Sequence, residues 1–180
     1  FTLSRRVPGY VNASKAVQKT DIARRRGNTD QSITDALKAV SANPAELAKT
    51  TSFGSVVFAK KPGDGSAREQ AASCQKVLGG DANICYEYAT KRYRSNCINW
   101  GIVPFTLDKG AGFDYAEGDY VYVPGIRNAI EKGIEDIPAK VVSGGKAFDV
   151  TLHVTNLTPE EKLILLTGCL MNYYAYLSKK

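Results

Sequence analysis

Strand-like and helix-like segments alternate between residues 53 and 105, with turn-forming residues between them. Residues 53–59 are β-branched and apolar, which is typical of a buried strand. Four segments continue the alternation: a helix over 67–78 ending at Gly79, a short strand over 83–85, a helix over 88–100 ending at Gly101, and a short strand over 102–105. This order restricts the chain to folds that mix strands and helices.

The flanking segments differ on the two sides of this alternation. The first fifty residues favour helices over 12–26, capped by Asn12 and ended by Gly27, over 30–40, and from Asn43 onward. We expect residues 1–50 to be a helical N-terminal segment and residues 51–180 the core of a single domain.

The segment after residue 105 is richer in strands. Strands are predicted over 120–123, 137–142 and 146–154, the last two joined by a hairpin turn at 143–145. A short helical turn fits 125–132. The capping box at 158–161 predicts a C-terminal helix that runs to about Leu177.

Residues 63–72, GDGSAREQAA, follow a predicted strand and open a predicted helix. Such a turn exposes backbone N–H groups at the positive end of a helix, where anions bind. We expect Gly63 and Gly65 to supply backbone angles and close approach that larger residues forbid. Ser66 is predicted at the N-cap, and Arg68 in the first turn offers a planar cationic fork for a carboxylate or phosphate.

Simpler interpretations of this turn stay open. Arg68 pairs with Glu69 or with solvent if the segment is an ordinary capped helix. Phosphate binding is weaker, because neither GxxxxGK[ST] nor GxGxxG is present. Serine nucleophile chemistry is weaker still, because GxSxG is absent and His153, the single histidine, is expected on the exposed face of a strand.

The cysteines predict neither a metal site nor a disulfide framework. They are Cys74, Cys85, Cys97 and Cys169, with no CxxC pair. We expect each to be a buried thiol on an apolar face, and no metal or cofactor to be bound by this chain. Four thiols in 180 residues favour a reducing compartment, so we expect a cytoplasmic protein.

The sequence argues against a membrane protein and against a nucleic-acid-binding protein. No apolar run reaches the roughly 18 residues needed to span a bilayer. Phe1 opens a polar, arginine-bearing stretch, which argues against a signal peptide, and we expect a fragment of something longer because Phe1 is not a methionine. The net charge of +6 is too small to indicate nucleic-acid binding alone.

Three ordered motifs resemble one family. GDGSAREQAA resembles the GxGSSREHAA signature of the C-terminal swivel domain of the aconitase family. Residues 77–80, VLGG, resemble that family's HLGG, and NCINWGIVPF at 96–105 resembles its N-x-x-x-x-G-I-L-P-L segment. The resemblance covers about residues 52–105. The tail TGCLMNYY and the form GSAREQ are typical of a divergent branch of aconitase-like hydratases.

The resemblance implies a three-layer β/β/α swivel domain (class α/β) with a partly parallel sheet and added terminal helices. It also implies a hydro-lyase that dehydrates and rehydrates a small hydroxy di- or tricarboxylic acid. Carried over, Ser66 is the catalytic base, and Gly65, Ala67 and Arg68 bind substrate. Ala67 replaces the family's second serine, and Gln70 its histidine.

In this family the four-iron four-sulfur cluster belongs to other domains. We therefore expect cluster-bearing aconitase-like domains as partner, in the same parent chain or a separate subunit, and an isolated chain without activity. The alternative is a non-catalytic module that binds a small carboxylate or RNA. RNA ranks lower because the basic residues are spread rather than clustered.

Overall fold

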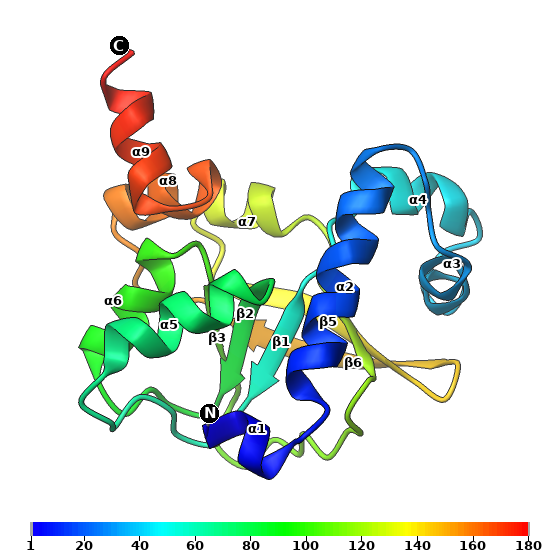
Figure 1. Cartoon of the computed structure of the whole chain (residues 1–180), viewed down its shortest axis with the longest axis horizontal. Helices are drawn as coiled ribbons and strands as arrows, with labels where there is room; N and C mark the ends of the chain where they lie inside the picture. The colour runs from blue at the N-terminus through cyan, green and yellow to red at the C-terminus, as the bar shows by residue number, and fades with distance from the viewer. Residues whose placement is uncertain (1, 180) are drawn as a thin grey trace.

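The computed structural model describes residues 2–179, within which the chain forms nine helices and six strands (Figure 1). Phe1, the residue on which the argument against a signal peptide depends, lies outside the described residues. The elements are α1 (Thr2–Arg6), α2 (Tyr10–Arg25), α3 (Gln31–Leu37), α4 (Pro44–Thr50), β1 (Ser55–Phe58), α5 (Arg68–Val77), β2 (Gly80–Cys85), α6 (Lys91–Asn99), β3 (Val103–Thr106), β4 (Tyr120–Tyr122), α7 (Ile126–Lys132), β5 (Asp136–Ser143), β6 (Lys146–His153), α8 (Pro159–Thr167) and α9 (Leu170–Leu177).

One sheet joins a parallel half to an antiparallel half. Its strand order is β1-β2-β3-β6-β5-β4. Strands β1, β2 and β3 are parallel, with α5 and α6 as their crossover helices, whereas β4, β5 and β6 are antiparallel. The two halves meet at a single ladder pair, Thr106 with His153. The partly parallel sheet and the helices at both ends of the chain confirm the predicted α/β class.

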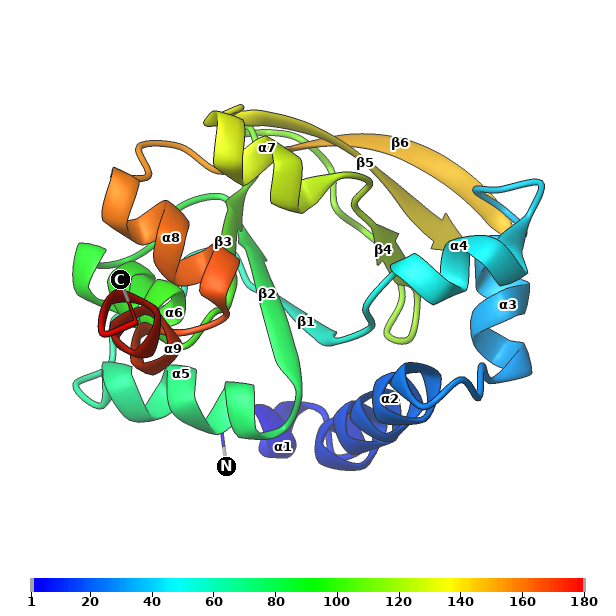
Figure 2. The ribbon, with the colours of Figure 1, turned by 90° about the horizontal axis from the view of Figure 1, so that it is seen from above.

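Helices cover the sheet in separate groups. Figure 2 shows α5, α6 and α8 gathered beside the parallel strands, with α3 and α4 at the far end of the antiparallel strands. The main core lies where strand residues such as Ile84, Phe105 and Leu152 meet Ala129 of α7. A second cluster packs Ile33 and Leu37 of α3 against Ala48 of α4 and is flanked by partly buried residues. No helix within residues 2–179 is long and apolar enough to cross a membrane.

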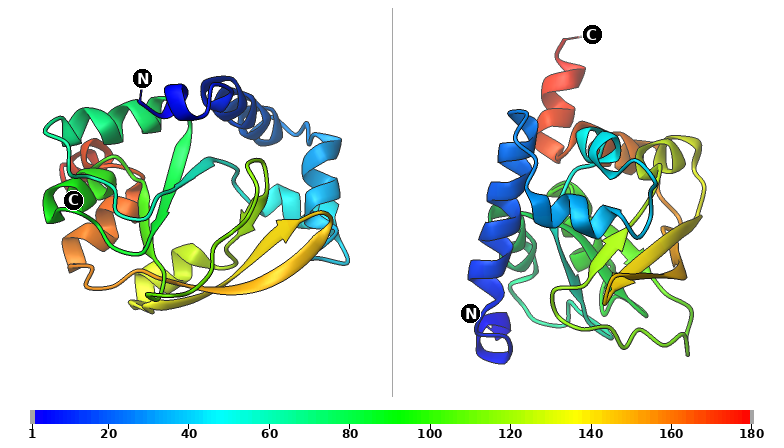
Figure 3. Two further views of the ribbon diagram at one scale, coloured as in Figure 1. Left: turned by 90° about the horizontal axis from the view of Figure 1, so that it is seen from below. Right: turned by 90° about the vertical axis from the view of Figure 1, so that its right-hand side faces the viewer.

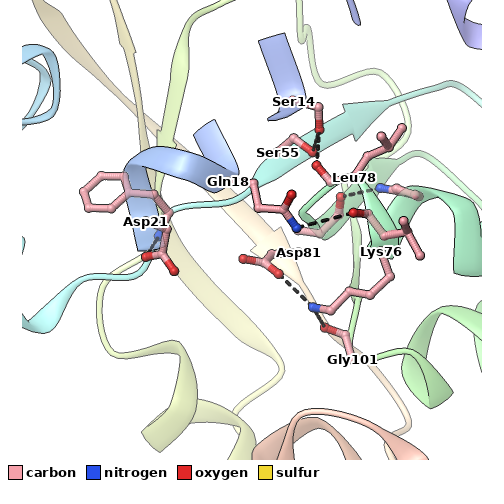
Figure 4. A network of polar contacts seen from close by, with 12 residues as sticks. Ser14, Gln18, Asp21, Ser55, Lys76, Leu78, Asp81 and Gly101 are labelled. Carbon is pink, nitrogen blue, oxygen red and sulfur yellow. Dashed lines mark hydrogen bonds and ion pairs between the residues drawn. The ribbon is translucent and has the colours of Figure 1, made fainter. Parts of the chain in front are cut away.

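Polar contacts attach α2 to the edge of the parallel half (Figure 4). The hydroxyl of Ser14 donates to the Leu78 carbonyl at 2.8 Å and contacts the Ser55 hydroxyl at 2.6 Å. At the other end of α2, the Asp21 carboxylate accepts from the Phe53 N–H at 3.0 Å. Helix α2 is therefore fixed to Phe53 and Ser55, at the entry to β1, and to Leu78, at the end of α5.

Most predicted helix ends are confirmed, but the predictions for the start of α2, for the C-terminal helix and for β1 are wrong. Asn12 lies inside α2, which begins two residues earlier behind Gly9. The predicted C-terminal helix is two helices, because Gly168 takes a φ of +102° and ends α8. Strand β1 is half-buried rather than buried, because it is an edge strand of the sheet.

The confirmed features are those with strong local signals. Thr158 and Glu161 form the capping box that opens α8. Gly144 and Gly145 turn the β5–β6 hairpin with φ of +55° and +75°, as a tight hairpin turn requires. Figure 3 shows that α9, beyond the Gly168 break, projects away from the body.

Candidate functional site

The candidate site is the loop of residues 59–67, which leaves the carboxyl end of β1 and leads into α5 (Figure 1). In open α/β sheets, ligands bind beyond the carboxyl ends of parallel strands. The first half of the loop is held against the segment that follows β2. The Tyr86 N–H donates to the Lys60 carbonyl at 3.2 Å, and the Ala89 N–H donates to the Pro62 carbonyl at 2.9 Å.

The two glycines of the loop have different roles. Gly63 has a φ of +98°, and a Cβ placed on it would lie 2.5 Å from the Cβ of Tyr93. Gly63 therefore provides both the backbone angle and the close approach that the sequence predicts. A Cβ on Gly65 would meet nothing within 4 Å, and Gly65 does not have a positive φ. The prediction that Gly65 supplies a special backbone angle and a close approach is therefore wrong within this chain.

Ser66 is not the N-cap of α5. The N-cap is Ala67, whose side chain has no oxygen to cap the helix, and Arg68 is the first helical residue. The serine directly precedes this N-cap, is exposed, and has no hydrogen-bond partner among residues 2–179. Its hydroxyl is consequently available, and no side chain caps the first-turn N–H groups of α5.

Arg68 has no protein partner within the described chain. Its side chain is half-buried, and its Nε is buried without a hydrogen bond. Glu69 does not pair with it, because the Glu69 carboxylate accepts from the indole N–H of Trp100 at 2.8 Å. A buried cationic N–H without an acceptor is costly, so this guanidinium favours an added anion.

A buried polar layer supports the loop from beneath. Gln75 of α5 donates to the side-chain oxygen of Asn83 at 2.7 Å, and the Asn83 amide donates to the Tyr93 hydroxyl at 3.3 Å. Tyr93 in turn packs against Gly63. These hydrogen bonds fix the Tyr93 side chain, against which the turn at Gly63 packs.

The thiols do not form a metal-binding set. Burial raises the pKa of Cys85 to about 12 and that of Cys97 to about 11, so both are protonated at neutral pH. Cys169 is half-buried, and Cys74 is exposed, which corrects the expectation that every thiol is buried. Among residues 2–179, no group of three or more His, Cys, Asp and Glu side chains is placed to hold a metal ion. The described residues do not fit an iron–sulfur cluster.

His153 lies elsewhere, at the junction of the sheet halves. Its Nδ1 is 2.8 Å from Asp136, and its Nε2 is 3.3 Å from Asp108. Its side chain is only 17% exposed, which corrects the expectation of an exposed strand position. Because it is engaged by two carboxylates and has no contact with Ser66, a serine–histidine pair is not formed.

Thr90 is a residue of the site that the sequence interpretation missed. It is the N-cap of α6, and its hydroxyl also donates to the Gly63 carbonyl at 3.0 Å. The predicted helix start at residue 88 placed it inside the helix. Threonine is among the residues preferred at N-caps, so Thr90 itself was the available signal for the true start of the helix.

The region of the chain that matches known proteins includes this loop. A family model for the aconitase C-terminal domain matches residues 11–110, more than half of the chain. The 3-isopropylmalate dehydratase small subunit of Metallosphaera sedula is 37% identical over 110 residues, and the match covers 58% of this chain and 64% of that protein. The chain thus spans less than two thirds of the length of this curated relative.

Among solved structures, the 3-isopropylmalate dehydratase LeuD of Methanocaldococcus jannaschii is 22% identical, with a TM-score of 0.47. That match covers 78% of this chain and 72% of the other. The family match includes the glycine turn, Ser66, Arg68 and the segment up to Phe105. The chain therefore belongs to the aconitase C-terminal domain family.

Proposed function

We propose that this chain is the small component of an aconitase-like hydro-lyase and that it presents Ser66 and Arg68 to a hydroxy carboxylic acid. The observation that carries the proposal is the partnerless guanidinium of Arg68, two residues after a free serine hydroxyl, at the start of an uncapped helix. Family membership supports the same assignment, because the matched residues include both side chains.

In this proposal Arg68 binds a substrate carboxylate. Arginine offers two parallel N–H groups that match the two oxygens of a carboxylate. The start of α5 adds about half a positive charge from the aligned peptide dipoles.

Ser66 takes the proton in the proposed reaction. The C–H bond next to the bound carboxylate breaks, and the proton passes to Oγ of Ser66. The electron pair forms a carbon–carbon double bond as the neighbouring hydroxyl leaves as hydroxide. The proton held by Ser66 then passes through solvent to this hydroxide, which restores the alkoxide and makes water the second product. A serine is a base only as its alkoxide, and Arg68 with the first-turn N–H groups of α5 would stabilise that charge.

The partner in this proposal is a separate cluster-bearing subunit. The curated relative is named a small subunit, and the described residues of this chain supply no metal-ligand set. The same relative suggests that the substrate belongs to the isopropylmalate class of hydroxy dicarboxylates. The gap beside Gly65, where a Cβ would meet nothing, leaves room for that substrate or for the partner's surface.

The test is turnover with and without a reconstituted cluster-bearing subunit of the isopropylmalate dehydratase type. The chain alone should be inactive. In the assembled enzyme, Ser66→Ala should lower kcat by about 100-fold or more, because only the basic oxygen is lost. Arg68→Lys should mainly raise KM, because a point charge replaces the fork.

Ser73→Ala is the matched control. Ser73 lies on α5, and its hydroxyl donates only to the Gln70 carbonyl of the same helix at 3.3 Å. It should retain wild-type turnover. Near-normal kcat in Ser66→Ala, or robust dehydration by the chain alone, would show that the assignment is wrong.

A binding module without catalysis is the second candidate. Ala67, in place of the family's second serine, favours it, because one hydroxyl that would contact substrate is missing. Calorimetry separates the two candidates. A module would bind a hydroxy dicarboxylate through Arg68, yet give no turnover with any cluster-bearing subunit.

A further inference from the structure

We propose that Thr90 is a positioning residue for this site. Its hydroxyl holds the Ser66 loop against the first turn of α6 and so decides where the serine lies. The inference rests on the proposed function of Ser66 and concerns a side chain that is not expected to touch substrate.

One hydroxyl makes two different hydrogen bonds. As acceptor, Oγ1 of Thr90 caps α6 by receiving the Tyr93 N–H at 3.2 Å. As donor, it gives its single proton to the Gly63 carbonyl at 3.0 Å. A capping residue needs only the acceptor, so the second bond is additional to the helix cap. The start of α6 and the turn before α5 are thereby joined through one atom.

The bond to Gly63 is the last tether before the serine. Preceding tethers are backbone bonds, from Tyr86 to Lys60 and from Ala89 to Pro62. Beyond Gly63, residues 64–66 make no hydrogen bond or ion pair within the described chain. The next anchored point is Ala67, whose carbonyl accepts the Ala71 N–H inside α5. Ser66 therefore lies on a short free span, and the Thr90 hydroxyl fixes one end of it.

The rest of the site does not replace this bond. The ring of Tyr93 packs against Gly63 from one side, but a packing contact limits only approach and not rotation of the Gly63 carbonyl. Arg68, in contrast, is anchored by α5 itself. Loss of the Thr90 bond should consequently move Ser66 while leaving Arg68 in place. Displacement of a reacting group by about 1 Å can cost about 100-fold in rate.

The assembled enzyme provides the first measurement. Thr90→Val, which removes both hydrogen bonds at nearly constant shape, should lower kcat by about tenfold or more and change KM less than threefold. Thr90→Ser keeps both bonds and should restore kcat. Thr158→Val removes the equivalent cap of α8, where Thr158 receives the Glu161 N–H at 3.1 Å, and should leave kcat unchanged.

Nitrogen-15 relaxation of the chain alone provides the second measurement and does not depend on catalysis. The Gly65 and Ser66 amides should fall below an order parameter of about 0.6 in Thr90→Val and stay near wild type in Thr90→Ser. If Thr90→Val does not fold, Thr90→Asp replaces it, because a carboxylate still caps α6 but cannot donate to Gly63.

The two measurements separate this inference from the proposed function. An assembled wild-type enzyme without turnover, combined with a mobile loop in Thr90→Val, would remove the hydro-lyase assignment and retain Thr90 as the residue that fixes the loop. Unchanged order parameters together with wild-type kcat in Thr90→Val would overturn the positioning role. A loss of kcat in Thr158→Val equal to that in Thr90→Val would also overturn it, because loss of a cap alone would then explain the effect.

Discussion

Replacement of Gly63 by alanine should destabilise the protein far more than the same change two residues later. At Gly63 the added methyl group would be forced into a left-handed backbone angle and would lie 2.5 Å from the Cβ of Tyr93. The angle costs roughly 1–2 kcal/mol. The overlap costs roughly 1–3 kcal/mol more, because Tyr93 is fixed by its hydrogen bond with Asn83 and cannot retreat cheaply. Together we expect about 3 kcal/mol of lost stability.

Urea unfolding followed by circular dichroism measures this loss directly. For a chain of this size, about 3 kcal/mol corresponds to a Tm lower by roughly 6–12 °C. Gly65→Ala is the control, because its methyl group would meet nothing and its φ is ordinary. We expect it within about 0.5 kcal/mol of wild type. Equal stability of the two variants would refute the assignment of Gly63 as the constrained glycine.

Two further predictions concern titratable groups. Burial alone would raise the pKa of Asp21, but the Phe53 N–H and two neighbouring arginines outweigh it and hold the pKa below its usual range. Its stabilising contribution is complete above the unfolded-state value, about pH 4, and is lost as pH falls through the folded-state pKa. Asp21→Asn should lower the free energy of unfolding at pH 7 by about 2 kcal/mol and flatten its decline in acid, as measured by urea unfolding across pH. A thiol reagent at pH 8 should label Cys74 in the native chain but spare Cys85 and Cys97 until unfolding, because burial raises both pKa values and blocks access. Mass spectrometry locates the labels, and native labelling of Cys97 would contradict this.

Local signals in the sequence predicted the secondary structure well. Gly27 and the Thr158 capping box act within one helical turn, so their effect does not depend on the rest of the fold. The break at Gly168 has a comparable local signal, but the apolar residues around it suggested one continuous helix. The positive φ of Gly168 ends the helix here, although apolar side chains continue on both sides of it.

Long-range contacts were not predictable in the same way. His153 was expected to be exposed because its strand alternates, yet Asp108 and Asp136 approach it from segments 45 and 17 residues away. At the candidate site, the motif predicts roles for Ser66 and Arg68, whereas the bond of Thr90 to Gly63, 27 residues away, is visible only in the folded chain. A sequence pattern reports which residues can perform chemistry, and the tertiary structure decides which others hold them.

The single ladder pair between β3 and β6 has a consequence for folding. Among the described residues, only one backbone ladder pair, Thr106 with His153, joins the two halves of the sheet. The parallel half closes through short βαβ connections, and the β5–β6 hairpin closes through a two-glycine turn. Each half can thus form its own strand pairs locally, and the coupling between them rests on side chains, because Ile84 and Phe105 of one half share a buried core with Ile137 and Leu152 of the other.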